Sequence, residues 1–338
     1  MQKEFHFQWH ITNSCNLRCL HCYQEDFTNI KELSWPELKK VSDNILETLD
    51  AWNKVTRINL TGGEPLLKKD LNLLLDYLNQ KTQVKELSLI TNLLLLDKQN
   101  LKELNDFSKL KKIKFSLEGL SSETCDFVRG EGVFNKILAS LDLLKANKGF
   151  KKTLMFTLLK RNLKDLPKIF NFCCEFDMES VILERFIPWG NGIKLKDQVL
   201  SSQEWQGVVN HVLELCQSYS AKEDLFRYKA FWIKFHPNSL PELFAANCNI
   251  LEDSLCIMPN ADIFPCRRFN LAIGNLTKDS LKDIWEHSSI LNEIRKKENL
   301  KGKCRSCAIK NCHGCRALAY ALTNDYLAQD PQCWYSDI

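Results

Sequence analysis

The sequence predicts an α/β fold in which a partial (β/α)6 barrel of the TIM type is followed by a small cysteine-rich domain. Two observations predict it. Short apolar runs alternate with longer amphipathic runs through the first 190 of 338 residues, and eight of the 15 cysteines lie between Cys248 and Cys333. Unbroken alternation of strand and helix implies a parallel sheet with right-handed crossovers. Six such units favour a curved or partly closed sheet over a flat one.

Six runs are short, apolar and rich in β-branched or aromatic residues, as strands of a parallel sheet are. We expect these strands at residues 5–11, 56–60, 86–90, 112–116, 153–158 and 180–184. The amphipathic runs between them predict helices at residues 34–49, 70–80, 97–107, 134–145 and 166–175. The first helix opens with Ser34-Trp-Pro-Glu37, which is the spacing of a capping box.

The regular alternation ends after Pro188, which marks the end of the barrel. A further helix is expected at residues 203–216, and Pro237 and Pro241 interrupt the chain beyond it. We therefore divide the chain into a barrel core at residues 1–190, a bridging linker at residues 191–245 and a cysteine-rich domain at residues 246–338. This last segment has few long apolar runs, so bound metal is expected to supply part of its stability.

Composition argues against several classes of protein. The chain has 46 Lys and Arg against 42 Asp and Glu, and a net charge of +4 indicates neither a nucleic-acid nor a membrane partner. No run reaches the roughly 18 apolar residues of a membrane span, and residues 1–10 lack the apolar region of an export signal. We therefore expect a cytoplasmic protein with reduced cysteines, for which metal ligation is the leading explanation.

Three cysteines follow the first predicted strand at the spacing Cys15-x3-Cys19-x2-Cys22. A structural zinc site uses four ligands, whereas three thiolates on an iron–sulfur cube leave one iron open to an outside ligand. The alternative is a zinc site completed by His21 or by a distant residue. The absence of a fourth cysteine from the motif favours the cube.

Polar residues also follow other predicted strands, at the edge where parallel strands end together. Gly62-Gly63-Glu64 follows the second strand, and its glycines permit close backbone approach while its carboxylate suits a free amino group. Further polar groups end the third, fourth and sixth strands, at Thr91-Asn92, Ser116 to Gly119 and Glu184-Arg185. Any one of them could be an ordinary polar cap, but together they predict a single active site on this rim.

These residues resemble the radical S-adenosylmethionine (radical SAM) enzymes, whose signature is this three-cysteine spacing followed by a Gly-Gly-Glu-Pro turn. The resemblance implies one [4Fe-4S] cluster on Cys15, Cys19 and Cys22, with its open iron chelated by the methionine part of S-adenosylmethionine. It further implies contacts to the amino group from Gly62, Gly63 and Glu64, to the ribose from Ser116, to the carboxylate from Arg129, and to the adenine from His21 and Asn92. Leu93 departs from the family pattern, in which glycine is common after the asparagine.

The spacing Cys304-x2-Cys307-x4-Cys312-x2-Cys315 could by itself be a zinc ribbon. Four more tail cysteines raise the number of candidate ligands to eight, enough for two four-ligand sites. With the run from Asn260 to Cys266, the tail resembles the SPASM extension of many radical SAM enzymes. The resemblance implies two auxiliary [4Fe-4S] clusters, one on Cys248, Cys256, Cys266 and Cys315 and one on Cys304, Cys307, Cys312 and Cys333. Cys256 lies in an apolar run, so the alternative is a buried structural thiol, which would leave one iron open.

Four cysteines belong to neither the rim nor the tail. Cys173, Cys174 and Cys216 fall on predicted helices and are expected in the core. Cys125 follows the fourth strand on the side of the active site. It is therefore our candidate catalytic residue, as a hydrogen-atom donor to a substrate radical.

The resemblance implies an enzyme that reductively cleaves S-adenosylmethionine to a 5′-deoxyadenosyl radical and abstracts hydrogen from a ribosomally made peptide. The modification would be a crosslink, an oxidation or an epimerisation. Only 14 residues precede Cys15, so we expect leader binding by the barrel itself or by a separate leader-binding protein. The resemblance also implies an electron donor such as flavodoxin or ferredoxin.

Three other functions remain open. Tetrapyrrole side-chain chemistry is the main alternative, because haem-pathway relatives have similar Gly-Cys-Arg-Ala tails and the Arg267-Arg268 pair could face substrate carboxylates. Formylglycine formation is less favoured, because relatives that perform it have aspartate at the position of Arg267. An iron–sulfur electron-transfer protein or a zinc-binding interaction protein would explain the cysteines but not the Gly62-Gly63-Glu64 turn at a strand end.

Overall fold

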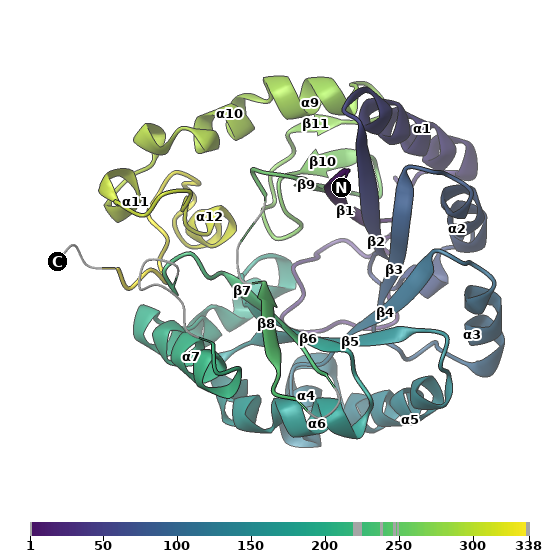
Figure 1. Ribbon diagram of the computed structural model, residues 1–338, viewed down its shortest axis with the longest axis horizontal. Coiled ribbons are helices and arrows are strands. Elements are labelled where there is room, and N and C mark those ends of the chain that lie inside the picture. Colours follow the sequence, from purple (N-terminus) through teal and green to yellow (C-terminus); the bar gives the residue numbers. More distant parts are fainter. Residues whose placement is uncertain (1, 219–224, 237–238, 246–247, 249, 336–338) are drawn as a thin grey trace.

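An eleven-stranded sheet curves around the centre of the molecule, and helices cover its outer side (Figure 1). The computed structural model describes residues 2–218, 225–236, 239–245, 248 and 250–335. The order of the strands is β11-β10-β9-β1-β2-β3-β4-β5-β6-β7-β8. The first strand of the chain therefore lies inside the sheet, with the carboxyl-terminal strands added on its free side.

The six predicted strands form the parallel centre of this sheet. They are β1 (Lys3–His10), β2 (Lys54–Thr61), β3 (Val84–Thr91), β4 (Leu110–Ser116), β5 (Lys151–Leu158) and β6 (Ser180–Arg185), each parallel to the next. The predicted helices lie between them as α1 (Trp35–Ala51), α2 (Leu71–Asn79), α3 (Lys98–Asn105), α5 (Val133–Ala146) and α6 (Ile169–Glu175). Ser34 and Glu37 form the predicted capping box of α1. The prediction of a six-unit partial barrel is confirmed.

The segment expected to be a linker also contributes to the sheet. It contains η3 (Gly190–Gln198), the predicted helix α7 (Ser202–Leu215), β7 (Ala230–Lys234) and β8 (Glu242–Ala245). β7 pairs with β6 and β8 with β7, both antiparallel. Strands of four or five residues show too little periodicity to be recognised from sequence, and these two were not predicted.

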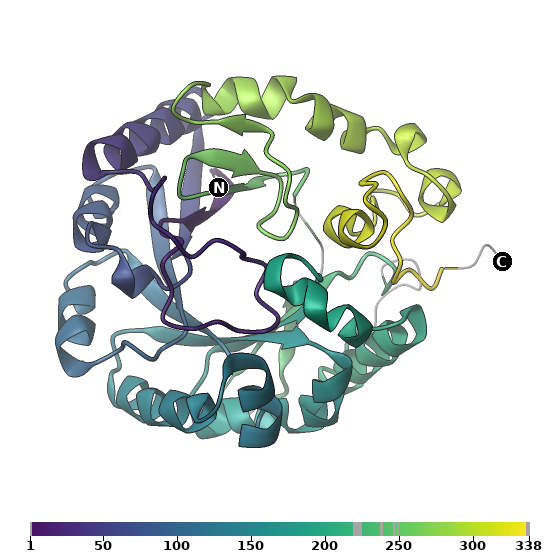
Figure 2. The same ribbon diagram turned by 180° about the vertical axis from the view of Figure 1, so that it is seen from behind.

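The cysteine-rich tail is joined to the barrel through the same sheet. β9 (Ser254–Ile257) pairs in parallel with β1, and β10 (Asp262–Phe264) and β11 (Gly274–Asn275) follow it antiparallel. The tail helices then continue around the ring beside the strands (Figures 1 and 2). They are α9 (Leu281–His287), α10 (Ser289–Arg295), η4 (Lys297–Asn299), α11 (Lys303–Ser306) and α12 (Arg316–Thr323).

The two faces of the sheet differ in polarity, as β1 illustrates. Its residues Phe5, Phe7 and Trp9 are fully buried in the hydrophobic core, and the Phe5 ring meets the edge of Trp285 from α9 with 5.1 Å between ring centroids. Burying each such side chain stabilises the fold by about 1.5–3 kcal/mol. The alternate residues of β1 are polar and face the barrel interior, where Gln8 lines a cavity.

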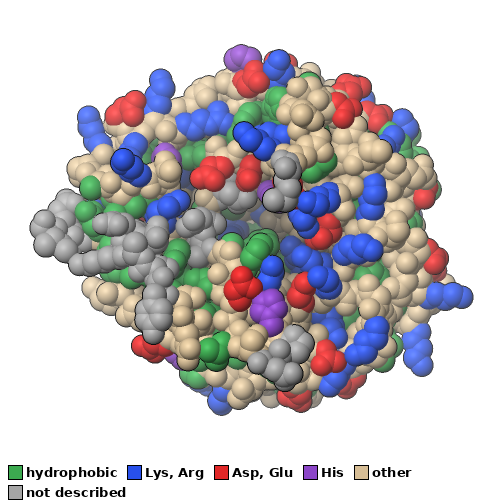
Figure 3. Space-filling view, viewed as in Figure 1, with side chains coloured by type: hydrophobic (Ala, Val, Ile, Leu, Met, Phe, Trp, Pro, Cys, Tyr) green, Lys and Arg blue, Asp and Glu red, His purple; other side chains and the backbone are tan. Residues whose placement is uncertain are grey.

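The loop that follows β1 runs across one mouth of the barrel (Figure 2). On the opposite face, acidic and basic side chains are interspersed around a central hollow (Figure 3). Three shorter helices complete the barrel: η1 (Pro65–Leu67), α4 (Ser122–Arg129) and η2 (Lys160–Lys168). Within the described residues, the structure contains no helix that is long and apolar enough to span a membrane.

Candidate active site and metal centres

The loop that carries Cys15, Cys19 and Cys22 has no regular secondary structure, and the Gly62-Gly63 turn after β2 holds it in place. The Gly63 N–H donates to the Thr12 carbonyl (2.9 Å), and the Glu64 N–H donates to the Ser14 carbonyl (2.8 Å). A Cβ on Gly63 would lie 2.5 Å from the Ser14 carbonyl oxygen and 2.7 Å from the Cys15 Cβ. Only glycine therefore allows the turn to approach the cysteine loop this closely.

The Glu64 carboxylate lies beneath the rim and not on the cavity wall. It is fully buried and accepts hydrogen bonds from the Thr91 hydroxyl (2.8 and 2.9 Å) and from the Asn92 N–H (2.8 Å). Burial raises the pKa of Glu64 to about 7, and these hydrogen bonds oppose the rise. Glu64 therefore ties the ends of β2 and β3 together.

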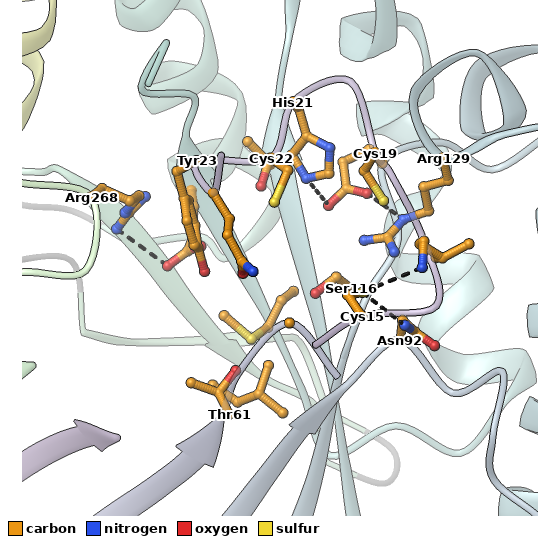
Figure 4. A pocket seen from close by; sticks show the side chains of 18 of the residues that line it. Cys15, Cys19, His21, Cys22, Tyr23, Thr61, Asn92, Ser116, Arg129 and Arg268 are labelled. Carbon is orange, nitrogen blue, oxygen red and sulfur yellow. Dashed lines mark hydrogen bonds and ion pairs between the residues drawn. The ribbon is translucent and has the colours of Figure 1, made fainter. Parts of the chain in front are cut away.

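A cavity of about 960 Å³, counting its open mouth, lies between this loop and the strand ends (Figure 4). Most of the residues predicted for the rim line it: Cys15, Cys19, His21, Cys22, Gly62, Gly63, Asn92, Ser116 and Arg129. Of the predicted contacts to S-adenosylmethionine and the predicted catalytic residue, Glu64 and Cys125 do not line it. The structure thus brings groups from the ends of β2, β3 and β4, from α4 and from the loop after β1 to one place.

Glu118, which follows β4, connects two of the predicted residues. The Arg129 Nε donates to its Oε2 (2.5 Å), and the His21 Nε2 lies 3.3 Å from its Oε1. Burial alone would raise the pKa of Glu118, but the Arg129 guanidinium and His21 lower it to about 2. The negative charge of Glu118 therefore fixes a cation from α4 and an imidazole from the cysteine loop on one wall. Burial also leaves the His21 Nδ1 without a hydrogen-bond partner among the described residues.

Tyr23 and Arg268 line the opposite wall of the cavity (Figure 4). Neither was among the predicted contacts to S-adenosylmethionine. The Arg268 Nη2 lies 3.4 Å from the Glu184 Oε1 at the end of β6. Its neighbour Arg267 is buried, donates to the His10 Nε2 (2.8 Å) and stacks on the Tyr23 ring. The expectation that both arginines face a substrate is therefore wrong for Arg267, because its guanidinium is buried against His10 and Tyr23.

Cys125 lies on α4, a short helix that the sequence did not predict. Its side chain is fully buried in the hydrophobic core, and burial raises the pKa of its thiol to about 12. Its proposed part as a hydrogen-atom donor stays a prediction. The same helix brings Arg129 to the cavity. Ser121 caps the helix by accepting a hydrogen bond from the Thr124 N–H, and this capping serine is a sequence signal from which a helix at residues 121–129 could have been predicted.

The three rim thiols are candidate metal ligands. Burial raises the pKa of Cys15, Cys19 and Cys22, that of Cys19 to about 12, so a metal must displace the protons to bind them as thiolates. In the described parts of the chain, no group of three or more His, Cys, Asp or Glu side chains converges on one metal ion. Three thiols on one open cavity are compatible with the cysteine ligands of an iron–sulfur cluster that keeps one iron free.

Four tail cysteines line a second, smaller cavity of about 330 Å³: Cys304, Cys307, Cys312 and Cys333. This is one of the two sets that the resemblance implied. Asp330 lies on the wall of this cavity and accepts from the Cys315 N–H (2.8 Å) and from the Arg185 Nη1 (2.9 Å). Burial would raise the pKa of Asp330, but Arg185 and Lys229 hold it well below its ordinary value. Asp330 therefore links the tail to the end of β6.

The cysteines of the other predicted tail set also lie near one another. Burial of its sulfur, together with the Cys266 and Cys315 thiolates, raises the pKa of Cys248 to about 12, so these three thiols are neighbours. Cys256 is buried in β9 with Gln8 of β1 beside it in register, so it faces the barrel interior. The Cys266 thiolate contributes to the raised pKa of Cys256, after burial. A ligand and a structural thiol both remain compatible with this position.

Comparison with known families agrees with these two regions. The radical SAM superfamily matches residues 9–173, which include the cysteine loop and the rim. The SPASM family, an iron–sulfur cluster-binding domain, matches residues 248–308.

Individual proteins are similar over nearly the whole chain. The AdoMet-dependent heme synthase of Methanosarcina barkeri is 27% identical over 97% of this chain and 95% of its own length. The mycofactocin maturase of Mycolicibacterium smegmatis is 26% identical over 96% of this chain and 81% of its own. Among solved structures, Streptococcus suis SuiB bound to its precursor peptide SuiA has a TM-score of 0.74 at 19% identity, over 99% of this chain and 77% of that one. The last likeness supports the fold alone.

Proposed function

This chain belongs to the radical SAM superfamily and carries a SPASM domain, and we propose that it modifies a side chain of a carboxylate-bearing tetrapyrrole. The observation that carries this substrate class is the similarity of the chain, across both domains, to AdoMet-dependent heme synthases from three organisms. A ribosomally made peptide, the first expectation from the sequence, is the second candidate.

We propose that Cys15, Cys19 and Cys22 hold a [4Fe-4S] cluster and that S-adenosylmethionine binds beside it. On reduction, this pair supplies the 5′-deoxyadenosyl radical that abstracts a hydrogen atom from substrate. Three thiolates would leave the cluster one position for the cofactor, and the cysteines line the cavity in which it would bind. A flavodoxin or a ferredoxin would donate the electron.

The wall residues have distinct parts in this proposal. The Gly62-Gly63 turn gives the cofactor close access to backbone, with Glu64 behind it fixing Thr91 and Asn92. Arg129 attracts the cofactor carboxylate while Glu118 holds its guanidinium in position. His21, Asn92 and Ser116 are assigned to the adenine and the ribose. These assignments follow the family pattern.

Arg268 is the residue that favours a substrate with carboxylates. Its guanidinium lines the cavity, and its contact with Glu184 is long, at 3.4 Å. A guanidinium presents several donors, so Arg268 can bind a substrate carboxylate while it keeps Glu184. Arg185 lines the same wall but is committed to Asp330.

The eight tail cysteines would hold two auxiliary [4Fe-4S] clusters. The first set is Cys248, Cys256, Cys266 and Cys315, and the second is Cys304, Cys307, Cys312 and Cys333. Four thiols around one small cavity support the second set, and the mutual effects on thiol pKa support the first.

The peptide candidate is favoured by the similarity to the mycofactocin maturase, which extends over most of both chains. In that case the cavity would receive a peptide segment. The leader would bind to the barrel or to a separate leader-binding protein.

One experiment separates the two substrates. The reconstituted, reduced enzyme with S-adenosylmethionine is given either iron-coproporphyrin III or the short peptides encoded beside its gene, and products are weighed by mass spectrometry. We expect 5′-deoxyadenosine and a mass change in the tetrapyrrole. In the Arg268→Gln variant, KM for the tetrapyrrole should rise while cleavage of S-adenosylmethionine without substrate is unchanged. A mass change in a peptide alone would contradict the tetrapyrrole and support the second candidate.

A further inference from the structure

Arg316, the first residue of α12, is a buried cation next to a predicted metal ligand. Its side chain is 1% exposed, and its Nη2 lies 3.6 Å from the Cys304 Sγ. Its Nη1 donates to the carbonyls of Tyr326 (3.0 Å) and Ala328 (2.6 Å). Among the described residues it forms no ion pair with a carboxylate. The nearby Asp325 pairs with Lys301 instead, at 2.6 Å.

The preceding glycine explains how the guanidinium reaches this sulfur. Gly314 has a φ of +64°, and a Cβ there would lie 2.6 Å from the Arg316 Nη2 and 3.2 Å from the Cys304 Sγ. The Gly314-Cys315-Arg316 sequence therefore combines a ligand of one predicted site, a cation beside the other, and the glycine that makes room for that cation.

Among the residues that the structure describes, the buried positive charges beside this cavity outnumber the buried carboxylates. Arg185, Lys229 and Arg316 are all less than 9% exposed, and Asp330 is the one buried carboxylate among the described residues beside them. Lys229 lines this cavity and Arg316 contacts its Cys304 sulfur, whereas Arg185 lines the rim cavity and contacts Asp330 from outside. Two positive charges beside the cavity against one negative leave one in excess. Lys303, which also lines the cavity, is exposed and its ammonium contacts the Tyr335 carbonyl (3.3 Å). Uncompensated buried charge is costly, so an anionic occupant is expected.

We infer that Arg316 is the counter-ion of a [4Fe-4S] cluster bound by Cys304, Cys307, Cys312 and Cys333, and that it raises the reduction potential of that cluster. The inference rests on the proposed auxiliary clusters. A cube with four thiolates has a net charge of roughly −2, which is opposite in sign to this excess of positive charge. Reduction adds one electron from a reductant such as dithionite and makes the cluster one charge more negative. A nearby cation stabilises this reduced form more than the oxidised one.

A second donor acts on the same sulfur. The Asp330 N–H lies 3.4 Å from the Cys304 Sγ, so this thiolate receives a backbone donor and a cationic donor together. Hydrogen bonds to cluster sulfurs raise the potential in the same direction as positive charge. Replacing Arg316 removes the charge and one donor but leaves the Asp330 N–H in place. The change in reduction potential on substitution therefore measures the contribution of the arginine side chain.

The test is a potentiometric titration of the full-length reconstituted protein, followed by electron paramagnetic resonance. Cys15, Cys19 and Cys22 are changed to alanine in every sample, so that only the two auxiliary clusters give signals. We expect Arg316→Gln to shift one of the two midpoint potentials to a more negative value and to leave the other unchanged. Arg316→Lys, which keeps the charge, should shift it less.

Arg305→Gln is the matched control. Arg305 follows Cys304 directly and has the same charge, but its side chain is exposed to water, which screens it. We expect no shift in this variant. An unchanged potential in Arg316→Gln at full iron content would overturn the inference, and so would an equal shift in Arg305→Gln.

Loss of the cluster from Arg316→Gln would still be informative. If Arg316→Lys then retains about four irons that Arg316→Gln loses, the positive charge is what the site requires, which supports the inference. If both variants lose them, Arg316 acts through packing and the inference fails. If the starting protein already lacks iron at this site, the proposed cluster itself is wrong, and the iron count shows this before any titration.

Discussion

The rim and tail cysteine sites differ in how many ligands they contain and in what else can enter. Three cysteines on an irregular loop face a cavity of about 960 Å³ at the rim, whereas four cysteines line a cavity of about 330 Å³ beside Cys304. At the rim, cationic Arg129 is paired with Glu118. In the tail, the partners of Arg316 within the described part of the chain are two backbone carbonyls and the Cys304 sulfur.

In the function that we propose, this difference separates a reaction site from an electron-storage site. A metal cluster with three protein ligands and adjoining space can bind a further molecule, whereas one with four ligands in a small cavity is closed. Charge follows the same division. Arg268 lines the rim cavity, whereas buried Arg316 in the tail contacts the Cys304 sulfur.

The largest expected effect separates the two kinds of site directly. Cys19→Ala should abolish formation of 5′-deoxyadenosine, because two thiolates cannot position the cluster at the rim. Cys307→Ala should lose iron but retain dithionite-driven cleavage of S-adenosylmethionine. Chromatography of the products and iron analysis measure both. Cys174 was expected in the core, but it is exposed on α6, on the side of the helix away from buried Cys173. Cys174→Ala is therefore the control and should match the parent protein. Equal loss of cleavage in Cys19→Ala and Cys307→Ala would contradict the distinction between the rim site and the tail site.

Asp330→Asn should destabilise the junction between tail and barrel by about 3–5 kcal/mol, because it leaves Arg185 and Lys229 buried without their carboxylate. Denaturant unfolding of the reconstituted protein measures this change. Asp325→Asn removes only the partly exposed pair with Lys301, so its effect should stay within about 1 kcal/mol. Similar effects of the two substitutions would show that the buried network does not hold the junction.

Glu118 predicts how the rim responds to acid. Its folded-state pKa of about 2 lies below the ordinary value of 4.5, so its contribution to stability is present above pH 4.5 and is lost as the pH falls toward 2. The contribution is roughly 3 kcal/mol. Unfolding free energies measured from pH 6 to pH 3 should therefore fall less steeply in Glu118→Gln than in the parent. Parallel curves would contradict the buried ion pair with Arg129.

The smallest expected effect concerns the turn that supports the cysteine loop. Gly63→Ala should cost about 1–3 kcal/mol, because its Cβ would meet backbone atoms of the loop at 2.5–2.6 Å and the loop must move. Gly207→Ala on α7 is the matched control. Its Cβ meets nothing within 4 Å, so the substitution should stabilise the protein by about 0.5–1 kcal/mol. Thermal unfolding of both variants checks the pair.

The parallel strands and their helices could be predicted because each repeats an apolar pattern over several residues. β1 to β6 and the capping box of Ser34 and Glu37 are confirmed on that basis. The four-residue β9 could not be recognised in this way, because its pairing with β1 depends on a segment some 250 residues away in the sequence. The same reason applies to Arg267. Its sequence neighbour Arg268 lines the cavity, but only the packing of His10 and Tyr23 shows that Arg267 does not.

The sequence by itself determined the chemistry available to this protein, because ligand type and spacing are local properties of the chain. Cys15, Cys19 and Cys22 lie within eight residues, and the glycines that approach them directly follow one strand. Only the tertiary structure decided how charge is distributed around the metal sites. Glu118 with Arg129, Asp330 with Arg185, and Arg316 with Cys304 are contacts between different elements of the fold. A buried charge without a partner costs free energy, so each of these charges lies next to a group that compensates it. The packing of the fold determines which group that is.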